Sequence, residues 1–201
     1  MPRLALLLTT FIWGATFPAT KAVLEQIPPF SFLFLRFLLG ALLVGGGYLL
    51  LRFHLHREPA LLRASAIATG WLILGYVFQT VGLNYTTASN SAFITALYVV
   101  IVPLILRRFD RRVWVAIGIA MVGLWLLVKP SASANLGDFL TLVCAIAFAA
   151  HIACLERFTR TVDAPSLFAW QMMAMVVLLF PTLLIEQAPA QAFAPTSLLL
   201  V

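Results

Sequence analysis

Polar side chains occur at helical spacing inside long apolar stretches of this sequence, and these are the places where chemistry could occur. Thr9, Trp13, Thr16 and Thr20 follow one another at intervals of four, three and four residues, so they share one helical face. Trp13 lies near the middle of its stretch, whereas tryptophans of membrane helices usually gather at the ends. We predict that Trp13 and Thr16 belong to a substrate-binding wall. The alternative is that Trp13 only fills a helix interface.

A second group of polar side chains lies between residues 64 and 106. Tyr76 and Gln79 occupy one apolar stretch, and Asn90, Thr95 and Tyr98 occupy the next. These groups could hydrogen-bond a zwitterionic or polar ligand without carrying a net charge. The alternative is hydrogen bonding between helices, which contributes about 0.6 kcal/mol per contact on average in membranes. We add all five residues to the candidate substrate-binding set.

His151 is the eighth candidate, because it is the only histidine within an apolar stretch. His54 and His56 lie in a basic connector instead. Histidine titrates close to neutral pH and could relay protons. The alternative is a histidine that only packs and satisfies its own hydrogen bonds.

Several kinds of site are missing from the sequence. No glycine-rich loop with a following Lys and Ser or Thr could cradle a nucleotide phosphate. No group of His, Cys and carboxylate residues has the spacing of metal ligands. Acidic residues lie at the ends of the apolar stretches or between them, so a carboxylate-driven proton pump is not supported. We expect no catalytic residues, no cofactor and no metal.

The composition places these residues in a membrane. Hydrophobic residues make up 63% of the 201 residues and charged residues 10%, whereas soluble domains carry about 25% charged residues. A helix that crosses the bilayer needs about 20 apolar residues. We therefore expect an all-α fold, a polytopic membrane helical bundle with about seven spans. The predicted spans are residues 4–24, 30–51, 64–83, 89–106, 113–128, 136–155 and 166–185.

The basic residues predict the orientation. With the N-terminus in the cytoplasm, ten of the thirteen Lys and Arg residues lie on the cytoplasmic side, as the positive-inside rule requires. Lys21 and Arg36 then lie near outer helix ends, where long side chains can reach the interface. We predict a multi-pass protein of the plasma membrane (the bacterial inner membrane) with a cytoplasmic N-terminus. Because topology explains the basic clusters, we expect no nucleic-acid partner.

An internal repeat underlies the predicted spans. A shift of 135 residues places Trp13 on Phe148, and it brings the first two spans onto the last two. A period of five spans is odd, so successive copies cross the membrane in opposite senses, as in many secondary transporters. We predict a first five-span repeat over residues 1–130 and an incomplete second repeat over 131–201. The second contains two spans and the start of a third at residues 197–201.

Several short motifs of the sequence belong together. The most specific motif is the run from Gly82 to Phe93, with Pro103 beyond it. The others are the segment Phe11–Phe17 followed by Lys21, the pair Arg36-Phe37, and the stretch Gly118 to Gly123. With these motifs the chain resembles drug/metabolite transporters of the EamA type. The resemblance covers residues 4–128 closely and 136–185 more loosely. It implies ten spans in two inverted five-helix EamA-like repeats around a central cavity, and we expect this chain to be a C-terminally truncated permease.

The sequence favours a secondary transporter that moves a small polar or amphipathic metabolite, such as an amino acid or a drug-like molecule, by alternating access. One alternative is a non-transporting membrane fragment or assembly partner. Another is an integral-membrane enzyme, which would need a cluster of catalytic polar residues at the interface. We find no such cluster and expect no enzyme. The expected partners are a small-molecule substrate and the lipid bilayer, and a homo-dimer is one arrangement open to the chain.

Overall fold

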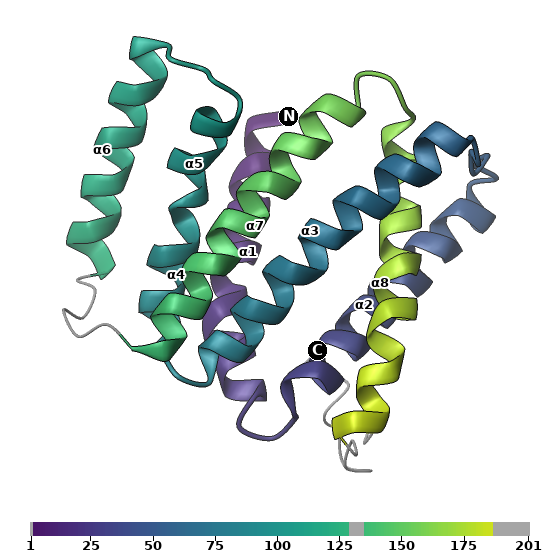
Figure 1. The fold of residues 1–201 in the computed structure, drawn as a ribbon, viewed down its shortest axis with the longest axis horizontal. Helices are drawn as coiled ribbons and strands as arrows, with labels where there is room; N and C mark the ends of the chain where they lie inside the picture. The colour runs from purple at the N-terminus through teal and green to yellow at the C-terminus, as the bar shows by residue number, and fades with distance from the viewer. Residues whose placement is uncertain (1, 129–134, 187–201) are drawn as a thin grey trace.

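The computed structural model describes residues 2–128 and 135–186, and every regular element in these ranges is an α-helix (Figure 1). This confirms the predicted all-α class. The helices are α1 (Pro2–Val23), α2 (Pro29–Leu50), α3 (Pro59–Leu83), α4 (Ala88–Ala96), α5 (Tyr98–Ile105), α6 (Arg111–Val128), α7 (Leu136–Phe158) and α8 (Ala164–Glu186).

Five helical segments of the described residues are long and apolar enough to cross a membrane: α2, α3, α4 together with α5, α7 and α8. The chain is therefore a polytopic helical membrane protein, as predicted. α1 and α6 occupy the positions of the other two predicted spans. The total of seven spans stays a prediction. The predicted start of a further span at residues 197–201 lies outside the described residues.

Local sequence explains where several helices begin. Pro29 and Pro59 start α2 and α3, because proline is suited to the first helical position, where its missing N–H is not needed. For this reason α3 begins at Pro59, earlier than the predicted boundary at residue 64. At the start of α7, Asn135 and Asp138 form a capping box, in which each side chain accepts a hydrogen bond from the backbone N–H of the other residue.

The predicted span at residues 89–106 consists of two helices. α4 ends at Ala96 and α5 begins at Tyr98, so that the helix is interrupted at Leu97. Pro103 lies inside α5 and Pro18 inside α1. The interruption therefore does not coincide with either proline.

α7 packs closely against α3, and it also contacts α4 and α5, while α2 packs against α8 (Figure 1). Glycines allow the close approach of α3 and α7. A Cβ atom at Gly137 would lie 2.5 Å from the carbonyl oxygen of Gly82, and one at Gly75 would overlap the ring of Phe148. Large apolar side chains of α2, α3, α7 and α8 fill the core beside this contact.

The two ends of the bundle differ in charge. The loops 51–58, 106–110 and 159–163 lie at the same end as the N-terminus, toward the top of Figure 1. We call this the arginine-rich end, because its loops and adjoining helix ends carry eight arginines. They are Arg52, Arg57, Arg107, Arg108, Arg111, Arg112, Arg157 and Arg160. The end that holds the turns 24–28 and 84–87 is called the opposite end.

Candidate functional site

Three of the predicted site residues meet at one cavity. Trp13 of α1, Thr95 of α4 and Tyr98 of α5 line a space of about 240 Å³, which Leu124 of α6 also borders. The rings of Trp13 and Tyr98 stack, with centroids 5.7 Å apart and an angle of 23° between their planes. We call this space the aromatic cavity. Its lining combines aromatic rings with a buried hydroxyl group, which suits a small amphipathic molecule.

Gln79 joins this cavity through Thr95. Its side-chain Nε2 donates a hydrogen bond to Thr95 Oγ1 over 3.4 Å, and both side chains are buried. Tyr76 lies one helical turn before Gln79 on α3. Its ring makes edge contacts with Phe37 and Phe148, at centroid distances of 5.0 and 5.1 Å. Tyr76 therefore continues the set of candidate residues toward α2 and α7.

Arg36 was not among the predicted site residues, yet the structure places it beside them. The guanidinium carbon of Arg36 lies 5.1 Å from the centroid of the Tyr76 ring, which is the geometry of a cation–π contact. Its side chain is half-buried. The sequence shows Arg36 only as a charge inside an apolar stretch, close to a predicted helix end.

Six residues thus form a row of side chains that crosses five helices, and we call it the polar row. It runs from the cation on α2, over α3 and α4, to the stacked rings on α5 and α1. Its members are Arg36, Tyr76, Gln79, Thr95, Tyr98 and Trp13.

The remaining three predicted residues do not lie in this row. The Thr16 hydroxyl donates to the backbone carbonyl of Trp13 over 2.6 Å. Asn90 Nδ2 donates to Asp138 Oδ1 over 3.5 Å at the opposite end. His151 Nε2 lies 2.9 Å from the Nε2 atom of Gln171, between α7 and α8, and both side chains are buried.

Polar contacts tie the helices together at the opposite end. The Lys21 ammonium group donates to the backbone carbonyls of Leu83 and Thr86, where α3 ends. The Thr86 hydroxyl donates to Asp138 Oδ1 over 2.5 Å. In addition, Glu186 accepts hydrogen bonds from the first backbone N–H groups of α2, at 3.0 and 2.8 Å. α1, α3 and α7 are thereby linked at this end, as are α2 and α8.

A larger cavity lies toward the arginine-rich end. It has a volume of about 570 Å³ between α5, α6 and α7, and Arg108 and Asp110 are among its lining residues. Tyr98 lines this space as well as the aromatic cavity. The phenol ring of Tyr98 is therefore a wall that the two cavities share. Glu156, at the same end, accepts hydrogen bonds from Arg108 and Arg160.

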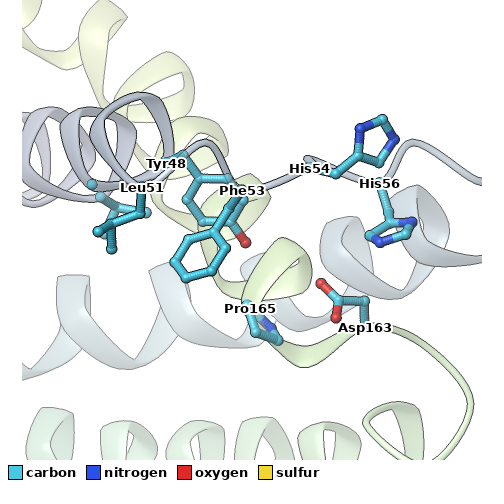
Figure 2. A pocket seen from close by; sticks show the side chains of 9 residues that line it. Tyr48, Leu51, Phe53, His54, His56, Asp163 and Pro165 are labelled. Carbon is cyan, nitrogen blue, oxygen red and sulfur yellow. The ribbon is translucent and has the colours of Figure 1, made fainter.

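A third cavity, of about 490 Å³, lies at the end of α2 and contains none of the predicted site residues. Figure 2 shows the rings of Tyr48 and Phe53 on one side of it and His56 with Asp163 on the other. Hydrogen bonds from the side chain and backbone of Ser166 hold the pKa of Asp163 below its usual range. The backbone N–H of His56 donates to Ser166 Oγ over 3.2 Å. This region therefore attaches the connector between α2 and α3 to the start of α8.

Metal ligation finds no support in the described part of the chain, where no three His, Cys, Asp or Glu side chains converge on a common point. What these residues do form is a bundle of membrane-length helices that contains the polar row and the aromatic cavity. The class of protein that this describes is a polytopic α-helical membrane protein.

The sequence profile of the EamA-like transporter family matches residues 2–129, and the chain belongs to this family. Two similar proteins from Archaeoglobus fulgidus are each described as an uncharacterized transporter. One is 37% identical over 188 residues and the other 26% identical over 189 residues, and each alignment covers 89% of this chain. The chain spans 56% and 65% of the lengths of these two relatives. No solved structure matches the chain.

Proposed function

We propose that this protein is a secondary transporter that moves a small polar or amphipathic metabolite across the membrane by alternating access. Its family and the two relatives that are described as transporters support a role in transport. The observation that carries the proposal is the aromatic cavity, where the stacked rings of Trp13 and Tyr98 lie beside the buried hydroxyl of Thr95. A cavity of about 240 Å³ with this lining suits a molecule of amino-acid size.

The position of Tyr98 supports alternating access. Its ring separates the aromatic cavity from the larger cavity toward the arginine-rich end. At the opposite end, the contacts of Lys21 and Thr86 hold three helices together. A substrate that enters from the arginine-rich end would then meet Tyr98 first and the aromatic cavity second. Release to the other side requires that the Lys21 contacts open.

The orientation and the repeat are part of the same proposal. The arginine-rich end faces the cytoplasm, since basic loops favour that side, and the protein lies in the plasma membrane. Residues 1–130 form one five-span repeat, and residues 131–201 belong to a second repeat of opposite orientation. Eight of the thirteen basic residues of the chain lie at the arginine-rich end, and this uneven distribution supports the orientation. A homo-dimer would be compatible with this arrangement.

Uptake into proteoliposomes tests the proposed transport. The purified chain is reconstituted, and a panel of radiolabelled amino acids and small amphipathic acids and amines is offered from outside. We expect saturable uptake of at least one compound, which an excess of the same unlabelled compound inhibits. The variant Tyr98→Ala should lower this uptake because it removes the wall between the two cavities. Uptake equal to that of protein-free liposomes for every compound would contradict the proposal.

A further inference from the structure

Arg36 carries its charge inside a segment that is long and apolar enough to span a membrane. It is the eighth residue of α2, and at 1.5 Å per residue it lies about 10 Å along the helix from its first residue. Charged side chains at such depth are rare in membrane helices because they are costly, and those that occur face the bundle interior and serve a function. Arg36 faces α3, since its guanidinium lies over Tyr76.

No acidic side chain among the described residues pairs with Arg36. The sequence has seven acidic residues, and the structure describes all of them. Asp138 and Glu186 accept hydrogen bonds at helix starts, and Glu156 pairs with two arginines of the arginine-rich end. The other four are exposed residues of loops and helix ends: Glu25, Glu58, Asp110 and Asp163.

The contact with Tyr76 holds the guanidinium in place without cancelling its charge. A cation–π contact is an attraction between the charge and the quadrupole of the ring, so the guanidinium N–H donors stay available to an anion. Arginine is well suited to this role because its planar group can hold a carboxylate through two parallel hydrogen bonds. Arg36 is thus a positioned cation without an anionic partner among the described residues.

The polar row leads from Arg36 to the aromatic cavity. Tyr76 and Gln79 are three residues apart on α3 and therefore lie on neighbouring positions of one helix face. Gln79 bonds to Thr95, which lines the cavity. A cation at one end of the row and aromatic rings at the other match a ligand with an anionic group and an apolar body.

We propose that Arg36 binds a carboxylate group of the transported metabolite, whose apolar part lies along Tyr76 toward the aromatic cavity. The substrate class is then a small carboxylic acid or amino acid with an apolar side chain. This inference rests on the proposed function, because it assigns a chemical class to the ligand of the same site.

Matched pairs of an acid and its amide test the role of Arg36. The purified chain in phosphatidylcholine nanodiscs is titrated calorimetrically with phenylacetate and phenylacetamide, and with N-acetyl-leucine and N-acetyl-leucinamide. The members of each pair differ mainly in charge. We expect the chain to bind the acid of at least one pair about tenfold more tightly than the amide, since hydrogen bonds between charged groups are the stronger ones. Arg36→Gln should lower the affinity for the acid to about that for the amide and so remove this preference, while Arg36→Lys should keep part of it.

Arg57→Gln is the control, because it removes an exposed cation from the connector at the arginine-rich end and should leave the preference unchanged. An equal affinity for acid and amide in the unaltered chain, or a preference that survives in Arg36→Gln, overturns the inference. Binding of neither member of either pair also overturns it. If phosphatidylglycerol in the nanodisc stabilises the chain through Arg36 without any acid preference, the anion is a lipid and the inference is wrong.

Uptake measurements separate this inference from the proposed function. Suppose that the unaltered chain shows no preference for acids and that Arg36→Gln takes up amides as well as the unaltered chain does. The proposed transport would then stand, and the assignment of a carboxylate to Arg36 would be wrong. Acid binding that depends on Arg36 without any uptake would support the inference and contradict transport by this chain.

Discussion

Among single residues, Trp13 and Trp71 allow a matched comparison of two substitutions, because each side chain is 37% exposed. Only Trp13 stacks on Tyr98 and lines the aromatic cavity. An aromatic pair contributes about 1 kcal/mol beyond its buried area, which corresponds to about fivefold in affinity. We expect Trp13→Ala to reduce substrate uptake at least about fivefold more than Trp71→Ala in proteoliposomes with equal protein content. Equal reductions in the two variants would argue against Trp13 as part of the binding site.

His151 tests whether transport uses a titratable group within the described helices. Its side chain is buried against Gln171, an arrangement that suits a packing role. Glutamine at this position keeps the capacity for hydrogen bonds and removes titration near neutral pH. We expect His151→Gln to keep substrate flux within about twofold and to leave its dependence on pH unchanged. Substrate-linked proton movement in liposomes that disappears in this variant would instead show a proton carrier that depends on His151.

Among the helices, the contact between α3 and α7 depends on two glycines, Gly82 and Gly137. A Cβ at Gly137 would lie 2.5 Å from the Gly82 oxygen and 2.7 Å from the Thr86 nitrogen, and backbone atoms cannot move aside as a flexible side chain can. We expect Gly137→Ala to destabilise the bundle by about 1–3 kcal/mol, as other overpacked sites do. Thermal unfolding in detergent measures this loss.

Gly70→Ala is the control for this comparison, since a Cβ at Gly70 of α3 has no neighbour within 4 Å. Alanine favours a helix over glycine by up to about 1 kcal/mol, so this variant should unfold at the same temperature as the unaltered chain or higher. If Gly137→Ala were as stable as Gly70→Ala, α3 and α7 could move apart without a loss of stability, and the prediction would be wrong.

Orientation in the membrane is a property of the whole molecule, and cysteine labelling tests it. The structure places residues 57 and 111 at the arginine-rich end and residue 25 at the opposite end. With Cys144 and Cys154 replaced by serine, we expect Arg57→Cys and Arg111→Cys to resist an impermeant thiol reagent in intact cells, because basic loops stay in the cytoplasm. Glu25→Cys should be labelled rapidly. The reverse pattern would invert the proposed topology.

The sequence by itself determined where the apolar helical segments lie, although not the interruption at Leu97, and it determined the uneven distribution of charge between the ends. Both are local properties: a run of about 20 apolar residues forms a helix in a bilayer whatever its neighbours are. The predicted boundary at residue 136 agrees with the start of α7, where the structure shows that Asn135 and Asp138 cap the helix. The prediction failed at the start of α3, because the preference of Pro59 for the first helical position was not considered.

Only the tertiary structure decided which polar residues meet. Trp13 and Tyr98 stack although they are 85 positions apart in the sequence, whereas His151 and Asn90 turn toward Gln171 and Asp138. The physical reason is that the face a helix presents depends on its rotation and on how closely its neighbours approach. Glycines at the contact between α3 and α7 set that approach. The same packing brings Tyr76 under Arg36, so a charge that the sequence assigned to a helix end lies over an aromatic ring inside the bundle.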